Sequence, residues 1–203
     1  MIVLPSDRTF VLASGSPRRR QLLNGAGLTF AVRAADIDET PLDDELPTAY
    51  VRRLSIEKAA ASAGSLLSSS AEVILAADTT VEIEGLILEK PRDDDEAYGM
   101  LRRLSGRAHQ VHTGVTVSVA SGGARRSSTI LVTTEVSFVA LTDDMIDWYL
   151  ATGEANDKAG AYGIQGAAAA FVRSVDGSVT NVIGLPLAET LELLRESLAA
   201  ASD

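Results

Sequence analysis

Residues 72–77 constrain the fold more than any other part of the sequence. They read Glu-Val-Ile-Leu-Ala-Ala, so five consecutive apolar residues stand between Glu72 and Asp78. A strand with one solvated face would alternate apolar and polar side chains. The uninterrupted run instead predicts a strand that is buried on both faces, as in the sheets of α/β proteins.

Other predicted strands and helices are interspersed with this strand along the chain. Further strands are expected at residues 10–13, 29–33, 110–120, 128–140 and 168–175, with a hairpin over 81–88. Helices are expected from Pro17, Thr48, Asp93, Thr142 and Pro186. Because several strands are linked by hairpins, the fold class expected is α/β with a mixed, twisted sheet and flanking helices. The 203 residues fit one domain, or one domain with a small second lobe.

Composition excludes several kinds of chemistry. The chain contains no cysteine, which excludes disulfides, thiolate nucleophiles and iron–sulfur clusters. Its two histidines, His109 and His112, lie three apart in a predicted strand and point to opposite faces, so they are interpreted as structural.

A formal net charge of −10 argues against nucleic-acid polymers as partners. With no membrane-length apolar run and no signal-peptide pattern, we expect no membrane association and a cytoplasmic location.

Three consecutive arginines, Arg18 to Arg20, stand at the predicted start of a helix. Ser16 suits the N-cap and Pro17 the first helical position. Positive charge in a first turn opposes the helix dipole, unless an anion bound there by backbone N–H and guanidinium groups reverses the penalty. The segment therefore indicates either a phosphate site or a solvated basic helix end.

Two acidic features could carry chemistry. Asp78 follows the buried strand, and ligand clefts in open α/β sheets form where strands end. An aspartate there could also simply form a turn. The acidic loop 36–39 could bind Mg²⁺, which needs one or two protein carboxylates, or could simply be solvated.

A glycine-rich segment spans residues 160–166 and includes Gln165. Its three glycines allow close backbone approach to a ligand, and the Gln165 amide offers both donors and an acceptor. The segment matches neither the Walker A nor the dinucleotide-binding pattern. A tight structural loop is the alternative.

Together, these segments resemble one family. The string Leu12-Ala13-Ser14-Gly15-Ser16-Pro17-Arg18-Arg19 resembles the opening motif of the Maf family, the septum-formation-associated nucleoside triphosphate pyrophosphatases. Later motifs follow in the family's order, at residues 77–79, 89–93, 104–106, 109–115, 157–166 and 184–187. The similarity runs from about residue 10 to residue 195. One departure is Ala155, where the family usually has proline.

The resemblance implies a fold similar to that of the inosine triphosphate pyrophosphatases, a single domain over residues 1–203 with two lobes around a cleft. It implies hydrolysis of a nucleoside triphosphate to the monophosphate and pyrophosphate with a divalent cation, Mg²⁺ or Mn²⁺, and a homodimer. Asp78 matches the family's proton acceptor, and the positions that match specificity residues are Arg18, Thr79 and Gln165. Further cleft positions of the family are matched by Ser16, Arg19, Glu39, Lys58, Lys90 and Lys158. The residues expected to bind phosphate are Ser16, Arg18, Arg19, Lys58, Lys90 and Lys158, and our candidates for metal contacts are Glu39 and Asp78.

The intact Gly-Ile-Gln-Gly at 163–166 looks like the branch that acts on dTTP and UTP, with modified pyrimidine nucleotides as further substrates. Three alternatives stay open at this point. The chain could be a nucleotide-binding regulator of septum formation without significant turnover, a Maf pyrophosphatase of different base specificity, or a phosphatase that releases orthophosphate.

Overall fold

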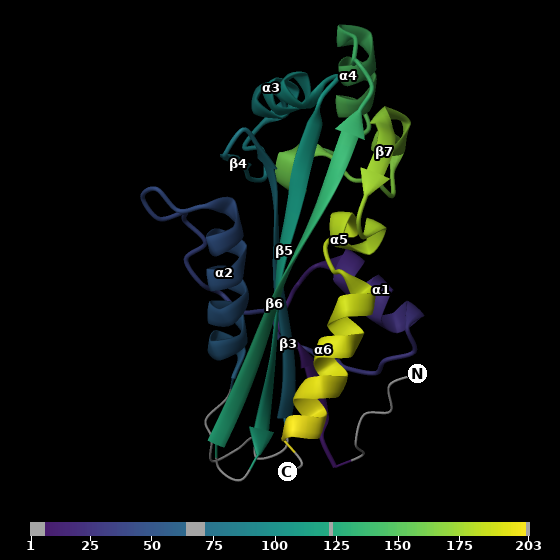
Figure 1. Ribbon diagram of the computed structural model, residues 1–203. Helices are drawn as coiled ribbons and strands as arrows, with labels where there is room; N and C mark the ends of the chain where they lie inside the picture. Colours follow the sequence, from purple (N-terminus) through teal and green to yellow (C-terminus); the bar gives the residue numbers. More distant parts are fainter. Residues whose placement is uncertain (1–6, 64–71, 122–123, 202–203) are drawn as a thin grey trace. The chain divides into compact units, whose positions relative to one another are not determined.

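The computed structural model describes residues 7–63, 72–121 and 124–201 (Figure 1). Its strands form one sheet in the order β2-β1-β3-β5-β6-β7, with β4 paired to β3 beside this path. β1 pairs in parallel with β2 and β3, whereas the β3–β4 and β6–β7 pairs are antiparallel. The predicted mixed α/β sheet is confirmed. The strands are β1 Thr9–Leu12, β2 Ala31–Val32, β3 Glu72–Ile83, β4 Leu86–Leu88, β5 Ala108–Ser121, β6 Ala124–Phe138 and β7 Val172–Asp176.

The helices divide between two compact units of the chain. Of the described residues, the first unit comprises 7–63, 72–78, 113–121, 124–131 and 184–201, and the second comprises 79–112 and 132–183. The first holds α1 Pro17–Gly25, α2 Pro47–Ser62 and α6 Leu187–Ala200. The second holds α3 Asp94–Leu104, α4 Asp143–Leu150, α5 Val179–Ile183 and the 3₁₀ turns η1 Ala159–Ala161 and η2 Ala167–Phe171. Among the described residues, no helix is long and apolar enough to span a bilayer.

In the first unit, helices cover both faces of the sheet. Val73, Leu75 and Ala77 of β3 pack in a cluster with residues of α1 and α6. Ile74 and Ala76 point the other way and pack with Ala59 of α2. Figure 1 shows α2 and α6 on opposite sides of the strands. The continuous apolar run of β3 is thus explained, because successive side chains of a strand point to opposite faces.

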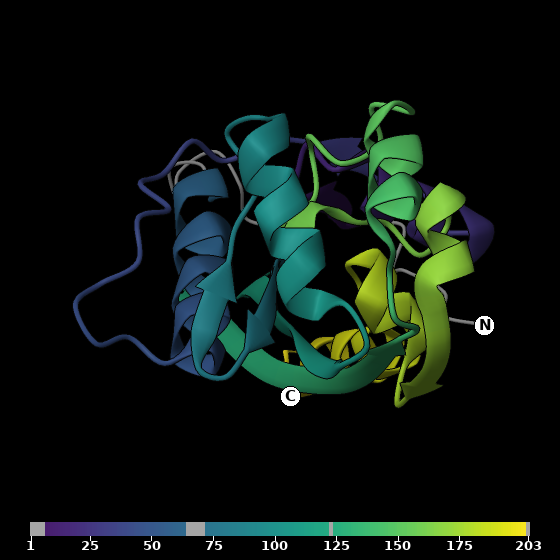
Figure 2. The same ribbon diagram turned by 90° about the horizontal axis from the view of Figure 1, so that it is seen from above.

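The second unit has its own core. α3 packs against α4 and η1, and its buried face joins the ends of β3, β5 and β6. Phe138, Tyr149, Tyr162 and Phe171 meet edge to face within this core. Figure 2 shows α3 and α4, in teal and green, from above.

Three local predictions were wrong. β3 does not end at Asp78 but continues to Ile83, because residues 81–83 pair with β4. α2 begins at Pro47 rather than Thr48, and no side chain caps its first turn. Residues 168–175 are not one strand, since residues up to Phe171 form a 3₁₀ turn before β7.

Candidate functional site

The first turn of α1 orients Arg19 inward. The Ser16 side chain caps the helix by accepting from the Arg19 backbone N–H at 3.4 Å, as the sequence predicted. The Arg19 guanidinium then donates from Nε to the Gly184 carbonyl at 2.8 Å and from Nη1 to the Ser14 hydroxyl at 3.0 Å. Arg18 is half-buried and Arg20 is exposed, so the three arginines occupy three different environments.

Arg19 belongs to the electrostatic surroundings of Asp78. Burial lowers the pKa of the Arg19 guanidinium, and the negative charges of Asp78 and Glu39 oppose that shift, while Arg18 adds to it. A buried cation is stable only near compensating charge. Arg19 therefore serves both as a link to Gly184 and as a positive charge beside the acids.

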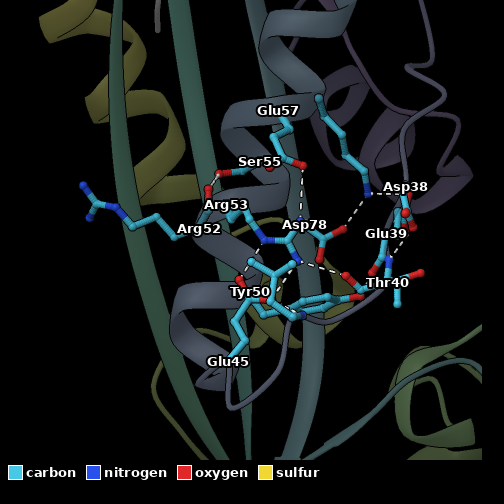
Figure 3. A network of polar contacts seen from close by, with 12 residues as sticks. Asp38, Glu39, Thr40, Glu45, Tyr50, Arg52, Arg53, Ser55, Glu57 and Asp78 are labelled. Atoms are coloured by element: carbon cyan, nitrogen blue, oxygen red, sulfur yellow. Dashed lines mark hydrogen bonds and ion pairs between the residues drawn. The ribbon is translucent and has the colours of Figure 1, made fainter.

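Lys58 joins the two acids that the sequence singled out. It extends from α2, and its Nζ lies 2.6 Å from Asp78 Oδ1 and 2.8 Å from Glu39 Oε1. Asp78 and Lys58 are buried, with 6% and 8% of their surface exposed, whereas the Glu39 side chain is 47% exposed. Figure 3 shows Asp78, from β3, and Glu39, from the acidic loop, approaching each other from opposite sides. A buried, compensated carboxylate with a solvent-facing acid beside it is suited to acid–base or metal chemistry.

The loop that carries Glu39 is held by residues that the sequence analysis missed. Tyr50 donates its hydroxyl hydrogen bond to the Glu39 carbonyl at 3.0 Å. Arg53 forms a bidentate pair with Glu45, with both N–O distances at 2.7 Å, and reaches the Thr40 carbonyl at 3.2 Å (Figure 3). Hydrogen bonds with Glu45 raise the pKa of Arg53. The signal available in the sequence was the Arg53–Glu57 spacing on one helix face, which gives an ion pair but does not reveal the loop contacts.

Glu39 and Asp78 could contribute to a metal site but do not complete one. No cluster of three or more metal-ligating side chains occurs among the described residues. Mg²⁺ commonly takes one or two carboxylates and completes its shell with water and phosphate oxygens, so two converging acids fit such an ion. Lys58 engages one oxygen of each acid and would compete for the same ligands.

Four predicted site residues belong to the second unit. Thr79 follows Asp78 on β3 and is half-buried, and Lys90 is exposed ahead of α3. Lys158 Nζ donates to the Glu154 carbonyl and to Asp157 Oδ1, both at 2.5 Å. Gln165 is exposed on the glycine-rich segment between η1 and η2.

The two histidines are both buried and have different partners. His109 lies against the Tyr162 hydroxyl, and His112 lies against the Thr133 hydroxyl. These contacts fit their interpretation as structural residues.

Comparison with known proteins shows the family of this chain. A family model described as Maf-like protein matches residues 9–197. The chain belongs to the Maf family. The order of its motifs and its mixed α/β sheet are those expected of Maf proteins.

Related Maf proteins are similar over nearly their whole length. A protein of Anaeromyxobacter dehalogenans (strain 2CP-C), named dTTP/UTP pyrophosphatase, is 53% identical over 187 residues, which cover 92% of this chain and 93% of the relative. Relatives from Myxococcus xanthus (strain DK1622) and Shewanella oneidensis are 49% and 50% identical and carry the same name. They match 95% and 92% of this chain and 94% and 97% of their own lengths.

Proposed function

We propose that this chain is a nucleoside triphosphate pyrophosphatase that hydrolyses dTTP and UTP to the monophosphate and pyrophosphate. The observation that carries the proposal is the buried Asp78, bonded to Lys58 and electrostatically coupled to Arg19, in a chain about half identical to several proteins named dTTP/UTP pyrophosphatase. A nucleotide substrate is consistent with a cytoplasmic location. The family resemblance alone supports a homodimer.

Asp78 is the proposed proton acceptor. Because Lys58 engages Oδ1, we assign Oδ2 to the water that attacks the α-phosphorus. The proton passes from that water to the carboxylate as the new P–O bond forms, and the bond between the α-phosphorus and the bridging oxygen breaks to release pyrophosphate. Lys58 and Arg19 compensate the negative charge of Asp78 as the phosphates approach.

Charge neutralisation is the second requirement. Phosphoryl-type transfer depends mainly on positioning and on balancing charge that spreads over phosphate oxygens. We assign this role to the N-cap Ser16 and to cationic side chains, with Lys90 and Lys158 supported by the family motifs alone. These residues are Ser16, Arg18, Arg19, Lys58, Lys90 and Lys158.

A divalent cation, Mg²⁺ or Mn²⁺, is proposed at Glu39 and Asp78. When bound, such an ion polarises phosphate oxygens and neutralises developing charge. The two acids supply hard oxygen ligands, and the exposure of Glu39 lets it reach an ion from solvent.

Base selectivity is proposed for Gln165, with Arg18 and Thr79. The Watson–Crick edge of thymine or uracil offers an N–H donor beside a carbonyl acceptor, and one amide can pair with both. The exposed Gln165 is available for this contact.

The decisive experiment is product analysis. The purified protein is incubated with dTTP, UTP, dCTP, dATP and dGTP, with Mg²⁺, with Mn²⁺ and with chelator, and pyrophosphate and orthophosphate are quantified separately. We expect pyrophosphate from dTTP and UTP, with dependence on the divalent ion. Orthophosphate as the first product would indicate a phosphatase, turnover of purines would indicate another base specificity, and binding without turnover would indicate a regulator. Each of these results would overturn the proposal.

A further inference from the structure

We propose that Glu154 is a positioning residue that holds Gln165 in place and thereby contributes to the choice of nucleobase. The inference rests on the proposed function and deepens it. A flexible glutamine would not select a pyrimidine, because its amide can turn over and present the opposite pattern of donor and acceptor. Selectivity therefore requires, as a first condition, that the backbone carrying this amide is held in one place.

Glu154 connects the two ends of the segment that carries Gln165. Its carboxylate Oε2 accepts a hydrogen bond from the Ala167 backbone N–H at 2.9 Å, thirteen residues along the chain. Its carbonyl accepts from Lys158 Nζ at 2.5 Å. The Glu154 backbone N–H is itself bonded to the Thr152 hydroxyl at 3.2 Å, directly after α4. One residue thus ties residues 158 and 167 to the end of a helix.

The Glu154 carboxylate lies directly against Gly166. A Cβ added at Gly166 would lie 1.9 Å from Glu154 Oε2 and 2.6 Å from the carboxyl carbon. Gly166 has φ −110° and ψ −150°, so it does not lie in the left-handed region that favours glycine. A side chain at this position would therefore have to displace the Glu154 carboxylate, which is the flexible end of its side chain.

Gln165 lies inside a turn that is fixed on both sides. The Gly166 N–H donates to the Gly163 carbonyl at 3.1 Å, which closes the turn around residues 164 and 165. At Gly163 an added Cβ would lie 2.6 Å from Lys158 Cε, so the lysine stem packs against this side. Glu154 packs against the other side. The backbone of Gln165 is held while its side chain stays exposed.

A second contact anchors the residues just before the turn. The Tyr162 hydroxyl lies 2.8 Å from His109 Nε2, and both side chains are buried. Gly160 donates from its N–H to the Glu89 carbonyl at 3.1 Å. These contacts fix residues 160–162 independently, so loss of Glu154 would free the turn at 163–167 without unfolding the whole segment.

The test measures discrimination between bases. Glu154→Ala removes the link to Ala167, Gly166→Ala adds a methyl group that displaces the carboxylate, and Glu154→Gln keeps an oxygen that can accept from Ala167. Gly99→Ala is the matched control, because Gly99 is exposed on α3, has no positive φ and has nothing within 4 Å of an added Cβ. We measure kcat and KM for dTTP and dCTP in all four variants and in the unaltered protein.

We expect Glu154→Ala and Gly166→Ala to raise KM for dTTP by about tenfold with a smaller change in kcat, which corresponds to about 1.4 kcal/mol of binding. The ratio of kcat/KM for dTTP to that for dCTP should fall severalfold in both. Glu154→Gln should retain most of the ratio, and Gly99→Ala should match the unaltered protein. Circular dichroism melts confirm that each variant is folded, and Glu154→Asp, which shortens the side chain by one methylene, replaces Glu154→Ala if that variant does not fold.

An unchanged dTTP/dCTP ratio in folded Gly166→Ala and in folded Glu154→Ala or Glu154→Asp would overturn this inference, even if the overall activity of these variants falls. That result would leave the proposed function standing. If the unaltered protein itself hydrolyses no pyrimidine triphosphate, the proposed function fails first. The two failures are thus distinguishable.

Discussion

In the first unit, Lys58 and Arg19 compensate the negative charge of Asp78 in different ways. Lys58 bonds Asp78 and Glu39 directly, whereas Arg19 acts on them through space while its hydrogen bonds go to Gly184 and Ser14. Both cations are buried, so removal of either one would leave buried polar groups short of a donor, at a cost of about 1–3 kcal/mol. Their contributions to catalysis and to stability can be separated by substitution.

Replacing Asp78 tests the proton acceptor. Asp78→Asn keeps the size of the side chain and its ability to accept from Lys58 but removes its basicity. We expect turnover of dTTP to fall by more than ~100-fold, the usual scale for loss of a general base, while binding of dTTP in the presence of Ca²⁺ persists. Asp95→Asn, at an exposed position of α3, is the control. Near-normal turnover of Asp78→Asn would contradict the assignment.

Arg19 and Arg20 allow a matched comparison of stability. Arg19→Met removes the guanidinium donors to the Gly184 carbonyl and to the Ser14 hydroxyl, which also accepts from the Ser16 N–H, and we expect a loss of about 1–3 kcal/mol in the free energy of unfolding. Arg20→Met, at an exposed position of the same turn, should change it by less than about 0.5 kcal/mol. Urea unfolding measures both. Equal changes in the free energy of unfolding in the two variants would show that the buried hydrogen bonds of Arg19 do not stabilise the protein.

The residues of the site were more predictable than their contacts. Asp78, Glu39, Lys58 and Arg19 were each singled out by their place in family motifs, and the structure brings them together. That Lys58 bonds both acids could not be predicted, because the acids lie 39 residues apart in the chain. Glu154 was not found for the same reason, since its partner Ala167 is thirteen residues away and offers only a backbone N–H.

At the scale of elements, helix α2 and strand β5 approach each other closely. Gly114 of β5 faces the backbone of α2, and a Cβ there would lie 2.3 Å from the Val51 carbonyl oxygen. Nearby, the hydroxyls of Ser55 and Thr116 lie 2.9 Å apart across the same contact. Since α2 also carries Lys58, the distance between this helix and the sheet determines where the ammonium lies.

We therefore expect Gly114→Ala to affect both stability and activity. The methyl group must push α2 away from β5, at a cost of about 1–3 kcal/mol for overpacking. Turnover should fall as well, because Lys58 moves with its helix. Thermal unfolding and dTTP hydrolysis provide the two measurements, with Gly99→Ala as the control. An unchanged melting temperature would show that α2 can move away from β5 without a loss of stability.

Elements with a strong local signal were predicted well. The Ser16 cap of α1, the Thr142 cap of α4 and the hairpin of β3 with β4 are all confirmed. β3 was predicted too short because Asp78 reads as a strand end, yet the residues beyond it pair with β4. The 3₁₀ turn Ala167–Phe171 was missed because an apolar run does not distinguish a buried strand from a buried turn.

At the scale of the whole molecule, stability should depend on pH through two buried histidines. Burial lowers the pKa of His109 to about 4, partly offset by the backbone at Arg107, and burial also lowers the pKa of His112, where Glu82 opposes the shift. The unfolded chain binds these protons near pH 6.5, so it takes up more protons than the folded protein between about pH 6.5 and 4. Stability is therefore full above that window and falls as the pH drops through it, by up to about 3 kcal/mol for His109.

His109→Gln checks this dependence, because glutamine does not titrate and can still bond the Tyr162 hydroxyl. We expect the drop in melting temperature between pH 7.5 and pH 5 to be smaller in His109→Gln than in the unaltered protein. The carboxylates remain the same in both proteins and cancel in the comparison. Equal drops would show that His109 is protonated in the folded protein.

The ammonium of Lys58 has one further consequence for the molecule. Because the chain itself supplies a positive charge between Asp78 and Glu39, the attraction of both acids to Lys58 offsets their mutual repulsion when no dissolved ion is present. Removal of divalent ions with EDTA should therefore leave the protein folded, with a cooperative thermal transition.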